Sequence, residues 1–404
     1  MITTFDSLYA GHVDLEDIGY GGKPVNERSF PKEHLATVFD KTQAIAQAMD
    51  RLNYDTLWLA EHHFQREGYE CIPNIPMLIL HLTHLTQRLR FGCGFNVTPM
   101  WHPLRLAEDF ATVDILTRGR AIFGVGRGYH TREVETFGAP LLDQDANREL
   151  FEEQVEIIFK AFNQDSFSHH SKYYDIPANV PYRGYDMESI TLVPRPLKLP
   201  VECWQPIQGG STRALDFMAK HGIKGTIGGG VAEGGAMDSV VLGYRDALAR
   251  AGRETEPGAD LNIGFHFYIA DSEEKALKEA APFYEENTKL LGPLRLTRGL
   301  SEEQIREISD PKRAPYAKDL PNIRNAANAG AFLCGPPELI TEKLLAASER
   351  YPGLSRVTVS QPVGTPLKVI LEQLEWFATA VMPVFKAHEV DAASAGRTGH
   401  SIAR

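Results

Sequence analysis

Short apolar runs alternate with longer amphipathic segments along this chain. Runs of this kind, rich in β-branched and aromatic residues, are typical of buried strands. We expect eight strands, near residues 2–8, 55–59, 89–97, 120–125, 200–205, 223–228, 261–269 and 356–361.

Between these runs, apolar side chains recur every three or four residues, as on one face of a helix. The clearest helical patterns cover residues 33–52, 147–162 and 366–388, and the last begins at Pro366, a residue favoured in the first turn. Strands that alternate with helices predict a parallel sheet. Eight such units in 404 residues favour an α/β fold closed as a (β/α)8 barrel, the TIM barrel, over an open sheet.

Two segments do not fit a minimal barrel. Residues 165–198, after the fourth predicted strand, are rich in Tyr, Pro and Ser, and we expect an inserted excursion with a small hairpin. Residues 290–330 form a second excursion after the seventh strand, and long loops of this kind are usually functional or mobile. We therefore expect one barrel domain over residues 1–388 and a disordered polar tail over 389–404.

Composition and charge narrow the class of protein. The chain is 43% hydrophobic and 24% charged, as in an ordinary soluble globular protein. The net charge of −11 disfavours nucleic acid and anionic membrane as partners. The N-terminus does not have the pattern of a signal peptide, and no apolar run is long enough to span a bilayer. The four cysteines, none in a Cys-x-x-Cys pair, suit a reducing compartment, so we expect a cytoplasmic protein.

The motif WLAEHHF, residues 58–64, ends the second predicted strand. In a (β/α)8 barrel the carboxyl ends of the strands carry the active site. Side chains alternate along a strand, so only one of His62 and His63 is expected to face the cavity. The alternative is a histidine that only packs or caps its loop. We expect no metal, because no His-Glu-x-x-His spacing and no third ligand are evident.

Two further motifs have features of an anion site. In GVGRGYH, residues 124–130, glycines allow close backbone approach and Arg127 offers a fork suited to phosphate. This motif is not the dinucleotide fingerprint, which would need glycine in place of Tyr129. Arg148, on the next predicted helix, could add charge to the same site. The alternative for this motif is a tight strand-to-helix turn.

The second of these motifs, QGGSTRAL, opens a predicted helix with free amide groups, hydroxyls and the positive end of the helix dipole. Its candidate binding residues are Gln208, Gly209, Gly210, Ser211 and Thr212. A plain helix cap is the alternative. Together the two motifs indicate a phosphate-bearing cofactor held by the loops after strands four and five.

The segment GCGFNVTPMWHP, residues 92–103, places glycines inside the third predicted strand. Glycine at such positions indicates a bulge or a close backbone approach. Asn96 could hydrogen-bond a flat heterocycle, or it could satisfy buried backbone.

These motifs, read together from residue 55 to residue 138, resemble the bacterial luciferase-like flavin-dependent monooxygenases. The Gly-Gly-Ser-Thr helix start and the segments at 335–344 and 372–386 add to the resemblance. It implies a (β/α)8 barrel that uses reduced FMN and dioxygen, through a flavin 4a-hydroperoxide, to oxygenate a substrate. It also implies a dimer, here expected as a homodimer, and a separate NAD(P)H flavin reductase that supplies the reduced flavin.

The resemblance carries site residues with it. His62 matches the histidine at the flavin–oxygen centre. Gly94 and Phe95 match a strand-three bulge behind the flavin, often a non-prolyl cis peptide, and the 290–330 excursion lies where a lid would close. The positions matched to phosphate binding are Arg127, Arg148, Ser211 and Thr212. Gly126 and Gln208 replace a reactive cysteine and an acid of the luciferase catalytic chain, which argues against light emission.

Other readings stay open: a deazaflavin-dependent oxidoreductase of the same superfamily, a non-catalytic flavin-binding subunit, and a metal-dependent barrel hydrolase. The sequence does not name the substrate. We expect an apolar cavity mouth and a small apolar organic substrate, from the residues Phe5, Trp101, Tyr129, Tyr182 and Phe265.

Overall fold

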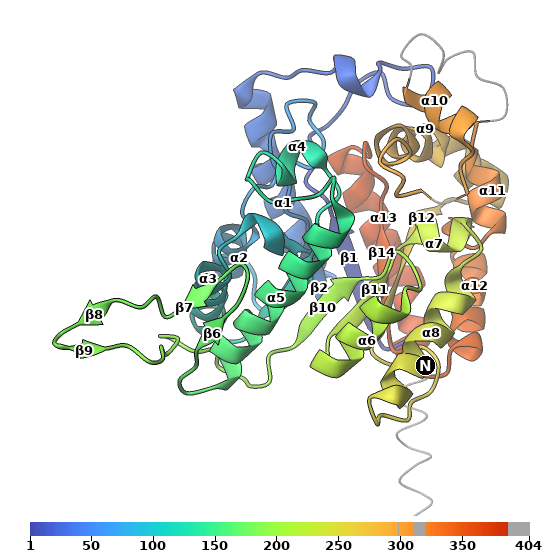
Figure 1. Ribbon diagram of the computed structural model, residues 1–404. Coiled ribbons are helices and arrows are strands. Elements are labelled where there is room, and N and C mark those ends of the chain that lie inside the picture. The colour runs from blue at the N-terminus through green and yellow to red at the C-terminus, as the bar shows by residue number, and fades with distance from the viewer. Residues whose placement is uncertain (298, 310–319, 387–404) are drawn as a thin grey trace, which may run out of the picture.

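The computed structural model describes residues 1–297, 299–309 and 320–386, and within them eight parallel strands close into a barrel (Figure 1). In order around the barrel they are β1 (Thr4–Tyr9), β2 (Thr56–Leu59), β3 (Arg90–Cys93), β5 (Ala121–Gly126), β10 (Cys203–Pro206), β11 (Lys224–Ile227), β12 (Leu261–Ile269) and β14 (Arg356–Ser360). Pairing of β14 with β1 closes the ring, with Phe5 opposite Val357. The predicted (β/α)8 barrel is confirmed.

Helices surround the barrel. The longer ones are α1 (Lys32–Arg51), α2 (Ile75–His84), α3 (Pro103–Leu116), α5 (Gln144–Asn163), α6 (Thr212–His221), α8 (Met237–Arg250), α9 (Glu273–Leu291), α12 (Pro337–Arg350) and α13 (Leu367–Ala380). The shorter ones are η1 (Val25–Glu27), η2 (Thr98–Met100), α4 (Thr131–Val134), α7 (Gly229–Glu233), α10 (Glu302–Ser309) and α11 (Ile323–Asn328). The helical patterns at 33–52 and 147–162 therefore correspond to α1 and α5. Pro366 is the N-cap of α13 rather than its first residue.

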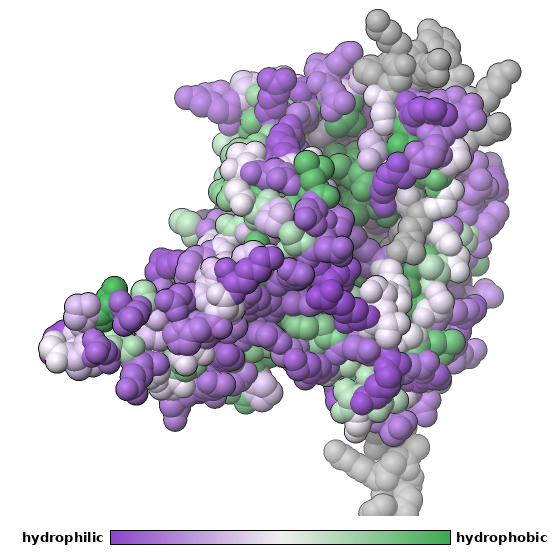
Figure 2. Space-filling view, in the orientation of Figure 1, coloured by the Kyte–Doolittle hydropathy of each residue, from purple (hydrophilic) through white to green (hydrophobic). Residues whose placement is uncertain are grey.

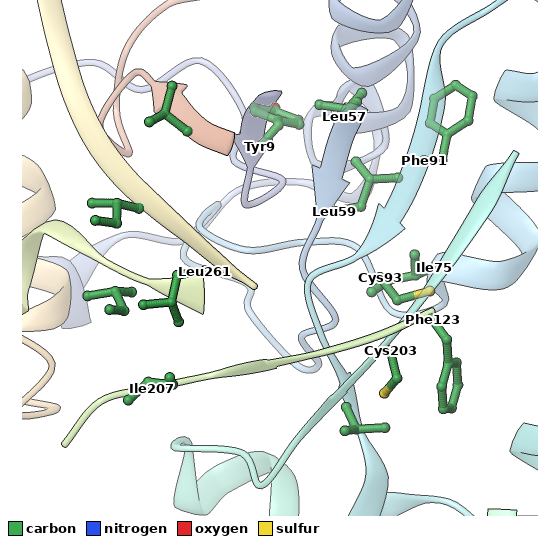
Figure 3. Close-up of a cluster of buried hydrophobic side chains, with 14 of the residues drawn as sticks. Tyr9, Leu57, Leu59, Ile75, Phe91, Cys93, Phe123, Cys203, Ile207 and Leu261 are labelled. Atoms are coloured by element: carbon green, nitrogen blue, oxygen red, sulfur yellow. The ribbon is translucent and has the colours of Figure 1, made fainter. Parts of the chain in front are cut away.

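Alternation along the strands divides the side chains into two layers. Phe91 lies opposite Leu57 in the β2–β3 ladder, and both belong to the large apolar core that includes the side chains drawn in Figure 3. Phe123, in the same core, packs on Phe110 of α3 and Phe162 of α5, with ring centroids 4.7 and 5.5 Å apart. The odd-numbered residues of β2, β3 and β5 therefore face the helices.

The inward layer follows from the same alternation. Trp58, Ile122 and Trp204, each one residue away from a helix-facing position, form a separate buried cluster inside the barrel. Every second residue after the inward-facing Trp58 also faces inward. These residues are Ala60 and His62, and both line a cavity at the carboxyl end of the barrel.

Several elements depart from the minimal barrel. β4 (Asn96–Val97) extends the pairing of β5, and β13 (Phe332–Gly335), which no sequence pattern indicated, pairs with the distal half of the nine-residue β12. The excursion at 165–198 holds two hairpins, β6 (His169–His170) with β7 (Asp175–Ile176), and β8 (Pro181–Tyr182) with β9 (Tyr185–Asp186). Figure 1 shows the β8–β9 hairpin projecting away from the barrel.

The described part of the 290–330 segment contains α10 and α11 rather than a plain loop. Residues 298 and 310–319 of this expected lid, the end of the predicted helix at 387–388 and the expected tail at 389–404 lie outside the described residues. Across the helices that are described, none combines the length and apolar character needed to cross a bilayer. All four cysteines are free thiols, and three of them are buried.

Buried charges fasten the loop between β1 and α1 to α9. The Glu286 carboxylate, fully buried, pairs with Arg28 at 3.1 Å and with Lys289 at 2.8 Å, and accepts a hydrogen bond from the Gly19 backbone N–H. Lys289 also donates to the backbone carbonyl of Gly19. This cluster fixes the loop against α9, two of whose residues, Asn287 and Leu291, line the cavity.

Candidate active site

The carboxyl ends of the barrel strands open on a cavity of about 490 Å³, the position where active sites of this fold form. A cavity of this size suits a small molecule or cofactor. Figure 2 shows hydrophobic surface around a recess between the α4–α5 side and the α9–α10 side of the molecule. A smaller chamber of about 110 Å³, lined in part by Trp58 and Phe265, shares Gly94, Phe95 and His266 with the main cavity.

One end of the cavity is cationic. Arg127, directly after β5, donates from Nε to Asn147 Oδ1 at 2.7 Å and from Nη2 to the Gln144 carbonyl at 3.0 Å, so the first turn of α5 holds its guanidinium in place. Burial and the neighbouring charge of Arg148 lower the pKa of Arg127 to about 10, which leaves it charged at neutral pH. Arg148, from α5, lines the same end.

The loop after β10 supplies the other half of this end. Gln208, Gly209 and Ser211 line the cavity, and Ser211 is the N-cap of α6 without a side-chain bond to the helix. Its hydroxyl and the first N–H groups of α6 are therefore available to an anion. Gly210 and Thr212 belong to the same turn but are not among the cavity-lining residues. Two guanidinium groups, a hydroxyl and a helix N-terminus are a donor set that fits a phosphate group.

The third strand ends at a cis peptide bond between Gly94 and Phe95, as the resemblance implied, and both residues line the cavity. Asn96 is not among the cavity-lining residues. It is buried beside the cavity, and its Nδ2 donates to the Gly124 carbonyl at 2.9 Å, so the structure gives it the bracing role of the two considered. Gln205 of β10, which the sequence analysis did not single out, lines the cavity with a buried Oε1 that has no hydrogen-bond partner among the described residues.

The two histidines of the EHHF motif face opposite ways, as strand alternation predicted. His62 lines the cavity and is 4% exposed. Its Nδ1 lies 3.2 Å from Glu133 Oε2, and its Nε2 lies 2.8 Å from the Tyr129 hydroxyl. His63 instead packs against the Phe137 ring, with centroids 4.8 Å apart, outside the cavity wall. The structure therefore selects His62 as the histidine of the site.

A chain of hydrogen bonds continues from His62. The Tyr129 hydroxyl donates to Glu70 Oε1 at 2.6 Å, and His130 Nε2 lies 2.9 Å from Glu70 Oε2. Glu70, like His62, lies in the connection after β2, and Glu133 lies in α4 after β5, so two connections meet at this point. The sequence analysis missed both acids, because single glutamates in irregular segments carry no periodic signal. The only available sign was their place close to the two recognised motifs.

The acids set the charge state of His62. Burial alone would lower the pKa of the imidazole, but the carboxylates of Glu70 and Glu133 outweigh it and raise the pKa above its ordinary value. Burial opposes ionisation of Glu70 as well, yet the charges of His62 and His130 and the Tyr129 hydroxyl lower its pKa to about 2. The two acids therefore favour the protonated form of His62, in which both ring nitrogens donate hydrogen bonds.

His62, Glu70 and His130 each direct one ligand-type atom to a common point, with these atoms within 4.8 Å of one another. The structure thus provides the third group that the sequence did not reveal. Each of these groups is already hydrogen-bonded within the set or to Tyr129. The arrangement therefore fits a proton-conducting network as it stands, and a cation would have to displace a proton from it.

The aromatic residues expected at the cavity mouth are only partly there. Tyr129 lines the main cavity and Phe265 the smaller chamber. The expectation was wrong for Phe5, which faces the helices and packs on Phe377 with centroids 5.7 Å apart, because its neighbour Asp6 takes the inward position. It was also wrong for Trp101, which donates to Glu61 but is not among the cavity-lining residues, and for Tyr182, which lies in the projecting hairpin.

Fold and site together define a (β/α)8-barrel protein with a phosphate-fitting pocket and a buried histidine whose pKa is raised by two acids. The family model for luciferase-like monooxygenases matches residues 4–352, and the chain belongs to this family. The oxygenase component of the flavin-dependent trigonelline monooxygenase of Acinetobacter baylyi is 23% identical over 370 residues, which cover 90% of this chain and 95% of that protein. Several other curated relatives match over only 37% to 44% of their own length.

Solved structures agree on the fold. The oxygenating constituent of 3,6-diketocamphane monooxygenase from Pseudomonas putida, solved with FMN, has a TM-score of 0.68 at 18% identity, covering 95% of this chain and 98% of that one. The coenzyme F420-dependent tetrahydromethanopterin reductase from Methanopyrus kandleri has a TM-score of 0.61 at 15% identity, covering 95% and 100%. At these identities the likeness concerns the barrel alone.

Proposed function

We propose that this protein is the oxygenase component of a two-component monooxygenase that uses reduced FMN and dioxygen to oxygenate a small organic substrate. The observation that carries the proposal is a single cavity with a phosphate-fitting end and a buried histidine that is hydrogen-bonded to Glu133 and Tyr129. The trigonelline relative is an oxygenase component, which supports a separate NAD(P)H flavin reductase as partner. The FMN in the diketocamphane structure supports FMN as the cofactor. We further propose a homodimer.

The residues of the cationic end fit the phosphate of FMN. Arg127, Arg148, Ser211 and the N-terminus of α6 would hold it, and Gly94 and Phe95 would lie against its ring system. Bound in reduced form, FMN supplies the electrons that activate dioxygen. The remaining work falls to the side chains of this chain.

His62 would hold a proton at Nε2, shared with the Tyr129 hydroxyl, and deliver it inside the cavity. Glu133 fixes the ring through Nδ1, and the Glu70 carboxylate, which accepts from the Tyr129 hydroxyl, stabilises the positive charge of the protonated ring. Because His62, Glu70 and Glu133 are all buried, this transfer is screened from bulk water.

Binding measurements test the cofactor. Charge-assisted contacts to phosphate contribute about 1.5–3 kcal/mol each, so FMN should bind at least about tenfold more tightly than riboflavin. Equal affinities for the two flavins would contradict the phosphate site. Turnover with an added flavin reductase, followed by mass spectrometry for a gain of one oxygen atom across a substrate panel, tests the reaction itself.

A deazaflavin-dependent oxidoreductase is the second candidate, supported by the F420-dependent protein of the same fold. Titration with F420 in parallel with FMN separates the two, because the true cofactor should bind more tightly. A pure protein that binds FMN but oxygenates nothing alone, and gains activity only with a second chain, would indicate a non-catalytic subunit instead.

A further inference from the structure

Two strands on opposite sides of the barrel contribute to the cavity. In the ring of eight strands, β14 lies directly across from β5. The two neighbours of β5, β3 and β10, are each three strands away from β14. Arg127 and the phosphate-fitting end follow β5. Gln361 follows β14, and it also lines the cavity. The two residues therefore occupy opposite walls.

The Gln361 amide is polar, buried and unused by the protein. Both Oε1 and Nε2 are shielded from solvent, and neither has a hydrogen-bond partner among the described residues. A buried amide without partners destabilises the folded state, so side chains of this kind usually meet a ligand or bound water. Gln361 offers one acceptor and two donors into the cavity.

His12 adds a second unused group on the same side. Its Nε2 lies 3.0 Å from the Thr365 carbonyl and can only donate to it, which leaves Nδ1 as an acceptor. Burial, and then the charge of Lys41, lower the pKa of His12 well below its ordinary value, so the ring is neutral. Its Nδ1 is buried and has no partner in the part of the chain that the structure describes.

The loop that carries Gln361 is fixed before any ligand arrives. The Leu8 backbone N–H donates to Ser360 Oγ at 2.8 Å, and Lys41 Nζ donates to the Thr365 carbonyl at 2.9 Å. Val363 N–H donates to Asn287 Oδ1 of α9 at 3.3 Å. A polar group held in this way discriminates strongly between ligands, because a ligand that cannot pair with it leaves it buried and unsatisfied.

The surroundings of these polar groups are apolar. Leu8, Ala10, Leu291, Leu296 and Val363 line the same wall of the cavity. A ligand that fits here needs an apolar body and one polar edge.

We propose that this wall is the substrate compartment and that it selects a compound with an amide-like edge, an N–H donor beside a carbonyl acceptor, on an apolar ring. Gln361 pairs with that edge, and His12 Nδ1 accepts a further hydrogen bond from the ligand. This inference rests on the proposed function, and it replaces the wholly apolar substrate expected from the sequence with a ring compound of lactam type.

The test compares two ring compounds of equal size, 2-quinolone, which has a lactam edge, and naphthalene, which has none. Each is titrated into FMN-loaded protein by calorimetry. The wild-type protein should bind 2-quinolone at least about tenfold more tightly than naphthalene. Gln361→Leu should reduce that preference to within about twofold and leave the affinity for FMN unchanged.

Gln361→Glu keeps the side-chain size and turns the donor into an acceptor, so it should weaken 2-quinolone and spare naphthalene even if the leucine variant folds poorly. Gln164→Leu, at an exposed position after α5, is the matched control and should behave as wild type.

Three outcomes would overturn the inference. The first is a wild-type protein that shows no preference between the two compounds, including one that binds neither. The second is a preference that survives in both Gln361 variants. The third is an equal loss of FMN and 2-quinolone affinity in Gln361→Leu, which would assign the amide to the cofactor. Failure of the protein to bind FMN at all would count against the proposed function instead. Titration of 2-quinolone and naphthalene into FMN-free protein would then still decide whether Gln361 binds the lactam edge.

Discussion

His62 Nε2 and the Tyr129 hydroxyl lie 2.8 Å apart, although the two residues come from the ends of different strands, β2 and β5. Because the pKa of His62 is raised by Glu70 and Glu133, its protonated form donates this hydrogen bond, and the Tyr129 hydroxyl donates its own hydrogen bond to Glu70. The consequence is a buried proton path from the cavity wall to a carboxylate, and it can be interrupted at each residue.

Removal of the histidine should uncouple the reaction. In His62→Ala we expect oxygenated product to fall about 100-fold or more, as for loss of a positioned acid–base group, with release of hydrogen peroxide in its place. FMN affinity should change little, because the phosphate-fitting end lies elsewhere in the cavity. His63→Ala is the matched control and should retain product formation, since His63 lies outside the cavity wall. Full product yield from His62→Ala would remove this residue from the mechanism.

The pH dependence should report the charge on His62. Its pKa is raised in the folded protein, so activity that needs the proton is present at low pH and is lost as pH rises through that pKa. Glu133→Gln removes one of the two anions and lowers the pKa, so the alkaline limb of the kcat profile should move to lower pH. Glu349→Gln, exposed on α12, should not move it. An unchanged limb in Glu133→Gln would show that another group controls it.

The hydroxyl of Tyr129 should matter for chemistry and not for cofactor binding. Tyr129→Phe keeps the ring in the cavity wall and breaks both hydrogen bonds of the hydroxyl. We expect kcat to fall about tenfold to 100-fold with an unchanged dissociation constant for FMN. Exposed Tyr185, in the projecting hairpin, provides the control variant Tyr185→Phe. A loss of FMN affinity equal to the loss of kcat would indicate a packing role.

The phosphate-fitting end should distinguish two flavins. Arg148→Ala removes one guanidinium, so FMN affinity should fall about tenfold or more while riboflavin affinity stays the same. Arg105→Ala, on the exposed face of α3, is the control. Fluorescence titration of both flavins against the three proteins measures the effect, and equal weakening of both flavins by Arg148→Ala would place the arginine near the ring system instead.

The buried charges between the first loop and α9 should be important for stability. Arg28→Met removes one partner of fully buried Glu286, and breaking a buried ion pair in this way costs about 3–5 kcal/mol. Arg51→Met, exposed at the end of α1, should change the free energy of unfolding by less than about 0.5 kcal/mol. Denaturant unfolding of both variants measures the difference. A loss below about 1 kcal/mol in Arg28→Met would show that the remaining partners of Glu286, among them Lys289 and the Gly19 N–H, satisfy it without Arg28.

The sequence by itself determined the architecture and half of the site. The eight strands can be predicted from the sequence because a half-buried strand has an apolar residue at every second position and a fully buried strand is a short apolar run. Both patterns are local in the chain. The helix start at Ser211 and the rule that only one of His62 and His63 faces the cavity are local too, since a helix start and strand parity need only a few neighbouring residues.

Tertiary structure decided the rest. Glu133 meets His62, and Tyr129 meets Glu70, only because the ends of β2 and β5 lie at the same rim of the barrel. These partners are 71 and 59 positions apart and leave no shared period in the chain. The same arrangement raises the pKa of His62, because it sets the carboxylates of Glu70 and Glu133 beside the imidazole. Phe5 and Gln361 show the same limit of sequence-based prediction. Packing across the barrel decides which wall a side chain faces and whether it finds a hydrogen-bond or packing partner there.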